Sequence, residues 1–264
     1  MLRKADILIC YEHSLRMHAL NSNEQVPIMT SGASGFGIEE SSVTPDGKWV
    51  VFLVQPITGY DTVNTTVQLM RVPITGGFPE PIFSTRQGTS FFCARSPSSV
   101  CAVAEESGDR KTMIVTAFDP LKGRGTELAR FALDYPSDIG VVVEHVLLCD
   151  ISPDGTRLAL SPREEGPIEI HSLQGNNSLV IPGKTSHKLK NMKAVRWAAD
   201  GKGLIVSSAT NDGGGEVFHL DFQGNTNTLW KCASYCIGLP SPDGRHLAIY
   251  NQSVNANMWM MENF

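Results

Sequence analysis

Ser152-Pro153-Asp154-Gly155-Thr156-Arg157-Leu158-Ala159-Leu160 is the stretch that decides the fold, because its pattern recurs along the chain. A polar four-residue turn leads directly into a short apolar strand. The five copies of the turn are Thr44-Pro45-Asp46-Gly47, Ser96-Pro97-Ser98-Ser99, Ser152-Pro153-Asp154-Gly155, Ala198-Ala199-Asp200-Gly201 and Ser241-Pro242-Asp243-Gly244. Their third residues are 52, 56, 46 and 43 residues apart. A period of this size with strands on both sides of each turn predicts a β-propeller.

Each residue type of the turn has a physical role. A serine or threonine hydroxyl in the first position can bond the backbone two residues on, and proline sets φ for the second position of a type I turn. Aspartate is favoured in the third position, and glycine accepts the positive φ that the exit of the turn often requires. The turn is therefore typical of a tight connection between two antiparallel strands.

Apolar strands are expected on both sides of every turn. The segment before the turn is 39–43, 91–95, 146–151, 194–197 or 236–239, and the segment after it is apolar and short. Such runs suit strands that are buried on both faces. A third strand and a fourth strand follow in most units. The third strands at 168–171 and 216–220 alternate polar and apolar residues, as expected nearer the exposed outer edge of a blade.

Four antiparallel strands per unit of about 50 residues make one propeller blade. The sequence therefore predicts an all-β, single-domain β-propeller with six blades, with five or seven as alternatives. The approximate blades are residues 1–31, 32–84, 85–132, 133–182, 183–231 and 232–264. The first blade is expected to lack its inner strand. The last is expected to lack its outer strand and to have a third strand at Met258–Met261.

Composition narrows the classes of partner and compartment. The net charge is −5 and the pI is about 5.8, which argues against nucleic-acid binding because that needs a basic surface. No apolar run approaches the length of a membrane span, and the N-terminal residues have no signal-peptide core. We therefore expect no membrane association and a cytoplasmic chain, or a periplasmic one if the sequence is a piece of a longer protein.

Six cysteines occur in the sequence, mostly within apolar, strand-like stretches. The spacing of Cys232 and Cys236 does not match a zinc knuckle, and no second pair accompanies them. Buried free thiols are the expectation for all six.

Two parts of the sequence resemble known propellers. The stretches 152–160 and 241–249 resemble the TolB-type repeat, which also forms the propeller of prolyl-oligopeptidase and dipeptidyl-peptidase enzymes. The string Asn255–Phe264 is similar to the C-terminal end of propellers attached to bacterial serine/threonine kinases or winged-helix regulators of the acidobacterial type. This resemblance implies a sensor or interaction module whose partner domain lies outside this chain. The second turn departs from the repeat by losing Asp and Gly, and the fourth by losing Ser and Pro.

Catalytic motifs are missing from the sequence. Gly32-Ala33-Ser34-Gly35-Phe36 lacks the last glycine of a nucleophile elbow, and no kinase loop motif is present. The seven histidines are scattered along the chain, and His171 and His219 belong to third strands, away from the axis. We therefore expect no catalytic residue, no metal site, no cofactor and no enzymatic activity.

The strand order indicates where a ligand would bind. The five turns share one end of the blades, here called the turn face. The fourth-to-first and second-to-third connections share the other end, here called the connection face. The candidate ligand-binding residues on the connection face are Phe36, Arg86, Tyr135, Glu144, His145, Lys190 and Tyr235, with Asp138, His187 and Lys188 in the same connections. This mixture of aromatic, acidic and basic groups suits a peptide or protein ligand, and a merely solvated rim is the alternative.

Three functions fit these observations. The first is a non-catalytic module that binds a protein, a peptide or a small ligand on the connection face. The second is a propeller enzyme, such as a lactonase or a lyase, with its site at the mouth of the channel. The third is a domain that only spaces or oligomerises an attached regulator.

Overall fold

The structure, a computed structural model, describes residues 6–11, 14–19, 24–30, 36–56, 66–86, 89–109, 111–132, 148–161, 166–175, 177–181 and 189–251. These residues form strands, turns and loops and include no helix. Within this part of the chain, no helix could therefore cross a membrane. All strand pairs are antiparallel, and within each sheet every strand pairs with its neighbours in sequence.

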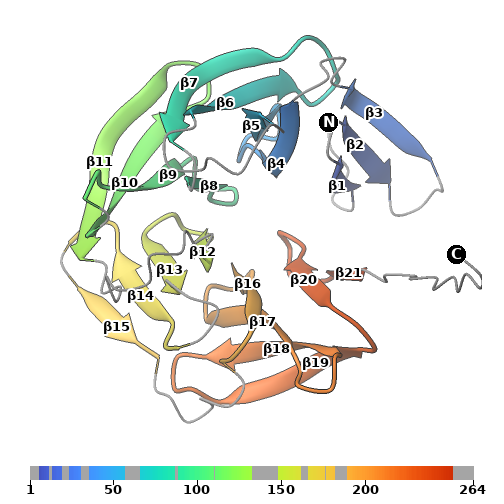
Figure 1. The fold of residues 1–264 in the computed structure, drawn as a ribbon, viewed down its shortest axis with the longest axis vertical. Coiled ribbons are helices and arrows are strands. Elements are labelled where there is room, and N and C mark those ends of the chain that lie inside the picture. The colour runs from blue at the N-terminus through green and yellow to red at the C-terminus, as the bar shows by residue number, and fades with distance from the viewer. Residues whose placement is uncertain are drawn as a thin grey trace, which may run out of the picture.

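Six sheets follow one another around a ring, with one strand of each complete sheet at the inside and one at the perimeter (Figure 1). The first sheet has three strands, and the last has two. The sheets consist of β1 (Asp6–Tyr11), β2 (Ser14–Ala19) and β3 (Gln25–Thr30); β4 (Phe36–Val43), β5 (Trp49–Pro56), β6 (Thr66–Pro73) and β7 (Glu80–Arg86); β8 (Ser90–Cys93), β9 (Cys101–Glu106), β10 (Thr112–Asp119) and β11 (Gly123–Ala132); β12 (Leu148–Ile151), β13 (Arg157–Ser161), β14 (Glu169–Ser172) and β15 (Ser178–Val180); β16 (Met192–Trp197), β17 (Gly203–Ala209), β18 (Gly215–Asp221) and β19 (Thr226–Cys232); and β20 (Cys236–Pro240) and β21 (Leu247–Asn251).

The predicted all-β propeller is confirmed. The described residues contain four complete four-stranded blades, where the sequence predicted six blades of which two were incomplete. The incomplete sheets are the first and the last, and they face each other across the open side of the ring (Figure 1). The third strand expected at Met258–Met261 lies outside the described residues.

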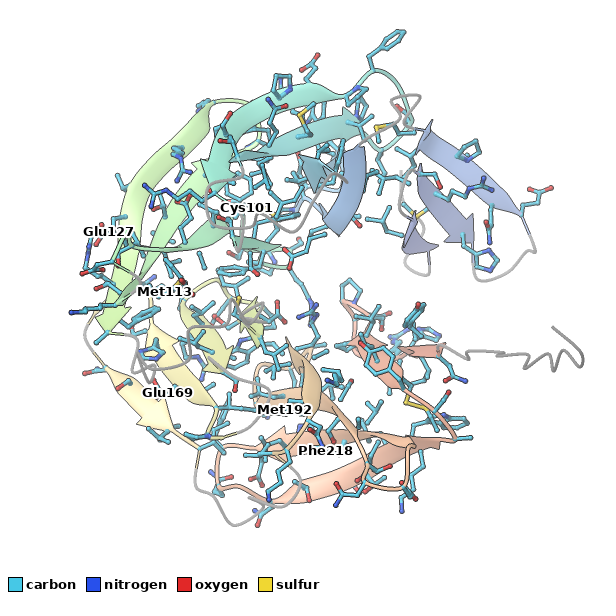
Figure 2. All side chains as sticks on the ribbon, viewed as in Figure 1. Cys101, Met113, Glu127, Glu169, Met192 and Phe218 are labelled. Atoms are coloured by element: carbon cyan, nitrogen blue, oxygen red, sulfur yellow. A yellow bond between two sulfur atoms is a disulfide. The ribbon has the colours of Figure 1, made fainter. Side chains whose placement is uncertain are left out.

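The hydrophobic core is divided among the interfaces between successive sheets. One cluster joins the sheet β12–β15 to the sheet β16–β19 and includes Ile170, Trp197 and Phe218, all at most 4% exposed. Figure 2 shows Met192 toward the inside of the ring and Glu127 at its outer perimeter. Each blade is therefore stabilised mainly by its two neighbours, as in other repeat folds.

Arginines add contacts between and within the blades. The Arg157 guanidinium lies 4.6 Å from the ring centroid of Trp197 in the next blade and donates to Gly201 O at 3.1 Å. Arg124 similarly covers Phe83 of the preceding blade at 4.4 Å and pairs with Glu105 of its own sheet. Stacking of a guanidinium on an aromatic face is favourable, and more so when partly desolvated.

The turns have one hydrogen-bond pattern wherever their residues allow it. Ser152 Oγ donates to Asp154 Oδ1 at 2.5 Å and accepts from the backbone N–H of Arg157 at 2.9 Å. The hydroxyl thus bonds the aspartate and the amide five residues on, rather than the backbone two residues on as the sequence suggested. Burial of Asp154 would raise its pKa, but the hydrogen bonds from Ser152 and Thr156 outweigh burial and lower it.

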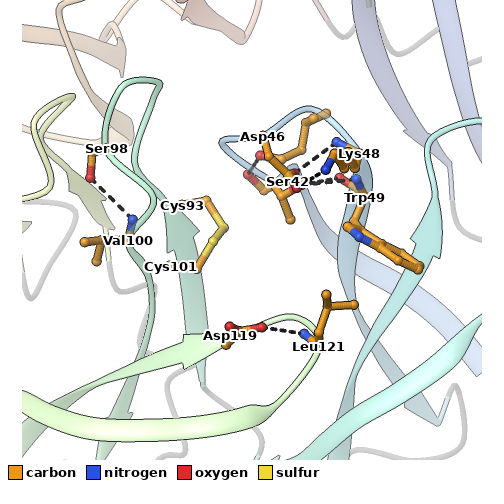
Figure 3. Close-up of a disulfide and its surroundings, with 12 residues drawn as sticks. Ser42, Asp46, Lys48, Trp49, Cys93, Ser98, Val100, Cys101, Asp119 and Leu121 are labelled. Atoms are coloured by element: carbon orange, nitrogen blue, oxygen red, sulfur yellow. Dashed lines mark hydrogen bonds and ion pairs between the residues drawn. A yellow bond between two sulfur atoms is a disulfide. The ribbon is translucent and has the colours of Figure 1, made fainter. Parts of the chain in front are cut away.

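The turns also contact one another around the turn face. A Cβ built on Gly155 would lie 2.3 Å from Ser98 Oγ of the preceding turn, and one on Gly244 would lie 3.0 Å from the Ala199 Cβ. Figure 3 shows Ser98 and Val100 with the hydrogen bond between them. The turn therefore connects two strands and is also part of the packing between blades.

Four of the six cysteines are paired, so the expectation of free thiols is wrong for them. Cys93 and Cys101 are opposite each other on β8 and β9 and form a disulfide (Figure 3). Cys232 and Cys236 form a second disulfide between the end of β19 and the start of β20. Sequence spacing did not show either pair, because partners are set by strand register and by the approach of two sheets. Cys149 is buried and free, as expected.

Candidate ligand-binding site

The connection face is built from contacts between the predicted sets of connections. Gly166, between β13 and β14, donates its N–H to Leu189 O in the connection that precedes β16, at 3.1 Å. Gly215, at the start of β18, is so close to the connection before β20 that an added Cβ would lie 2.8 Å from Ser234 O. Second-to-third and fourth-to-first connections therefore meet at the same end of the blades, opposite the turns.

The predicted ligand-binding residues are only partly described. Tyr135, Glu144 and His145, like Asp138, His187 and Lys188, lie outside the described residues. Phe36 begins β4, and the structure describes its backbone only. Arg86, Lys190 and Tyr235 are described and lie at the ends of strands or beside them on the connection face.

Arg86 is the last residue of β7, and its side chain is exposed. A Cβ on Gly108, in the β9–β10 connection of the next blade, would lie 3.5 Å from Arg86 Nη1. Arg86 also contributes to the lowered pKa of Glu105. Burial of Glu105 would raise this pKa, but hydrogen bonds from Arg124 and Thr85 and the charges of Arg124 and Arg86 lower it. Arg86 is thus a cation that extends over the boundary between two blades.

Lys190 and Tyr235 lie close to the starts of two other inner strands. Lys190 is exposed two residues before β16, and Tyr235 is half-buried directly before β20. The disulfide Cys232–Cys236 holds the short connection that contains Tyr235. Residues from three connections are therefore brought to one face, in agreement with the strand order.

Three polar side chains that bond the inner strand of the next blade were not predicted. Glu40 Oε2 on β4 accepts the backbone N–H of Phe91 on β8 at 3.2 Å. Asp150 Oδ2 on β12 likewise accepts the N–H of Trp197 on β16 at 2.8 Å, and Ser207 Oγ accepts the N–H of Gly238 at 2.9 Å. An inner strand is a sheet edge with unpaired amides. These three side chains satisfy such amides across blade boundaries, and we call them the edge latches.

Two arginines surround the Asp150 latch. Burial raises the pKa of Asp150, while the charges of Arg196 and Arg95 and the hydrogen bonds from Trp197 and Ile151 oppose this rise. Arg196 Nη1 donates to Val195 O at 3.0 Å and to Cys149 O at 3.4 Å. Burial lowers the pKa of Arg95, Asp150 opposes this, and Arg196 adds to it.

The inner strands carry mainly apolar residues in the sequence, so the charges of Asp150 and Arg196 were not predicted to meet. A signal was present, because Asp150 and Arg196 both lie four residues before the third residue of their turns. They therefore occupy equivalent positions in successive blades, one acidic and one basic. Comparing the repeats position by position would have placed them together.

The outer perimeter has a separate groove of about 390 Å³ between β11 and the β14–β15 hairpin. His171 on β14 stacks on Phe131 with ring centroids 4.1 Å apart, and its Nε2 lies 2.8 Å from Glu169 Oε2. Both side chains that contact His171, Phe131 and Glu169, therefore belong to strands of the fold. Within the described ranges, no group of three or more His, Cys, Asp or Glu side chains is arranged to hold a metal ion.

Solved structures with a similar fold include proteins of different kinds. TolB from Acinetobacter baumannii is 16% identical with a TM-score of 0.54 over 92% of this chain and 56% of that chain. A putative 6-phosphogluconolactonase from Bacteroides fragilis is 10% identical with a TM-score of 0.51 over 93% and 87%. An oligogalacturonate lyase in complex with manganese is 11% identical with a TM-score of 0.51 over 91% and 66%. No family profile and no curated protein sequence matches this chain.

These similarities define the chain as a β-propeller with TolB among its structural neighbours. At such low identity they establish the fold alone, because one fold can serve different functions. This chain spans just over half of the TolB chain.

Proposed function

We propose that this chain is a non-catalytic binding module that takes a protein or peptide partner, or a small ligand, on its connection face. The carrying observation is that Arg86, Lys190 and Tyr235, from three separate connections, lie at the same end of the blades. Basic and aromatic side chains on loops over a rigid frame are typical of recognition surfaces. The module serves as the sensor part of a longer signalling protein, in keeping with the resemblance of its C-terminal string.

Capture from a cell lysate by the immobilised chain tests this proposal. The variant Arg86→Ala/Tyr235→Ala removes a cation and an aromatic group from the connection face. The matched control is Lys202→Ala/Arg245→Ala, which removes two exposed cations from the turn face. Bound proteins are quantified by mass spectrometry, after circular dichroism has shown that all three chains are folded.

The expected result is a partner that the wild type and the turn-face control retain and that the connection-face variant loses by at least tenfold, equivalent to about 1.4 kcal/mol. The absence of any partner, or equal retention of one partner by all three chains, would contradict the proposal. Turnover of a lactone or an oligosaccharide substrate by the purified chain would instead favour the enzyme hypothesis.

A further inference from the structure

The groove at the outer perimeter lies between two blades whose outer strands differ in length. β11, the outer strand of one blade, has ten residues, and β15, the outer strand of the next, has three (Figure 1). The second half of β11 and the β14–β15 hairpin line a space of about 390 Å³. Pockets that take small molecules have volumes of roughly 300–1,000 Å³. The groove therefore has the volume of a small-molecule site.

Strand register shows which side chains face this groove. His171 on β14 is directly opposite Ser178 on β15, so the two side chains lie on the same face of the hairpin. The neighbouring residue Ile170 points to the other face and belongs to the core. On β11, a register shift leaves Leu128 without an opposite residue on β10, and a bulge of this kind re-aims the side chains beside it. One face of the hairpin and a bulged part of β11 therefore form the two walls.

The apolar part of the groove contains two stacked rings. The rings of Phe131 and His171 have centroids 4.1 Å apart and planes 29° apart, and both residues line the groove. Leu128 lines it beside them. Phe131 and Leu128 also pack, partly buried, against the core cluster between the two blades. The fold thus holds an apolar wall in place, against which the C–H groups of a ligand can pack.

The charged side chains of the groove are already paired. Arg130 donates to Glu127 through Nε at 3.0 Å and through Nη2 at 2.8 Å. His171 Nε2 lies 2.8 Å from Glu169 Oε2. Arg130 and His171 are the only titratable side chains among the described residues that line the groove. Because both have an acidic partner, the groove favours a neutral ligand over an ion.

Four polar groups of the groove form no hydrogen bond to any described residue. They are Arg130 Nη1, His171 Nδ1, the Asn177 side-chain amide and the Ser178 hydroxyl. The guanidinium nitrogen is a donor, and the amide and the hydroxyl are both donors and acceptors. A neutral imidazole that donates to a carboxylate through Nε2 accepts through Nδ1. The groove therefore offers donors and acceptors together, next to an apolar wall.

We propose that this groove binds a neutral carbohydrate. Each sugar hydroxyl is one donor and two acceptors, so the hydroxyls of one ring satisfy both the donor Arg130 Nη1 and the acceptor His171 Nδ1. The C–H face of the sugar ring packs against the apolar wall that contains Phe131. The site lies on the perimeter, so it is separate from the connection face of the proposed function.

A glycan array that carries neutral and acidic mono-, di- and trisaccharides tests this groove, with the whole chain fluorescently labelled. Isothermal titration calorimetry then measures the affinity for the neutral saccharide with the strongest signal. The groove variant is Arg130→Ala/Asn177→Ala. The matched control is Asn227→Ala/Arg245→Ala, which removes an exposed amide from the outer strand β19 and an exposed cation from a turn. All four residues are exposed, so both chains are expected to fold as the wild type does, which circular dichroism checks.

A second variant, Ser178→Phe, fills the groove and leaves its charges in place. The wild type and the control are expected to bind at least one neutral saccharide, and both groove variants to bind it at least tenfold more weakly. No binding of a neutral saccharide, a preference for acidic saccharides, or equal binding by either groove variant would overturn the proposal. The connection-face variant Arg86→Ala/Tyr235→Ala should bind the saccharide as the wild type does, so the two proposed sites are tested independently.

Discussion

At the scale of the residue, the repeated turn requires a positive φ at its glycine and a hydrogen-bond acceptor at its aspartate. Gly47, Gly155, Gly201 and Gly244 have φ values of 68°, 74°, 68° and 69°, a region that favours glycine. Where the first residue has a hydroxyl, the aspartate accepts a hydrogen bond from it. Ser241 Oγ, for example, donates to Asp243 Oδ1 at 2.7 Å. Where the first residue is Ala198, Asp200 keeps only the backbone part of the pattern, accepting Lys202 N at 3.0 Å.

The replacement Gly155→Ala separates the two reasons for glycine in the turn. Gly155 has a positive φ and also contacts Ser98, whereas Gly213 has φ +86° and no atom within 4 Å of an added Cβ. We expect Gly155→Ala to lower the free energy of unfolding by about 3 kcal/mol and Gly213→Ala by about 1 kcal/mol. Urea denaturation of both variants measures the difference. Equal losses would show that contact between turns contributes nothing.

At the scale of the element, the inner strands are sheet edges that need partners for their amides. The edge latches Glu40, Asp150 and Ser207 provide these partners from the preceding blade. The disulfide Cys93–Cys101 joins the inner strand β8 to β9 within one blade, and Cys232–Cys236 joins β19 to β20 across two sheets. Glu40, Asp150, Ser207 and the disulfide Cys232–Cys236 therefore connect successive sheets to one another.

The thiol chemistry of these strands can be measured directly. Iodoacetamide is expected to leave Cys149 unmodified in native buffer, because burial, followed by the nearby charge of Glu40, raises the pKa of its thiol. In urea without reductant it should modify Cys149 but not Cys93, Cys101, Cys232 or Cys236. With reductant in urea, iodoacetamide should modify Cys149 and the four cysteines of the two disulfides. Peptide mass spectrometry reads each site, and labelling of the paired cysteines before reduction would contradict the disulfides.

At the scale of the whole molecule, the interfaces between sheets differ in size. Thirteen buried residues form the cluster between the sheets β12–β15 and β16–β19, but only three buried residues form the one between β16–β19 and β20–β21. In a repeat fold, stability follows such nearest-neighbour interfaces. The last sheet has one described neighbour. The interface with that neighbour is therefore the weakest of the interfaces described.

Hydrogen exchange tests this ranking along the chain. We expect the amides of β20 and β21 to exchange faster than those of β16, β17 and β18, because local opening costs less where little apolar surface is buried. Deuterium uptake by peptides, measured by mass spectrometry in native buffer, gives both rates from one sample. Equal protection of the two sheets would show that the ring opens only as a unit.

The sequence by itself determined the repeating unit, the strands beside each turn and the two faces of the ring. A turn with Pro, Asp and Gly and an apolar strand are local features, and their period implies a propeller. Only the tertiary structure decided which groups meet across strands and blades: the Glu40 carboxylate with the Phe91 N–H, Asp150 with Arg95 and Arg196, and the two cysteine pairs. These partners are about 40 to 55 residues apart or depend on strand register. Their meeting is set by strand register and by how one blade is rotated against the next, and the pattern within a single repeat specifies neither.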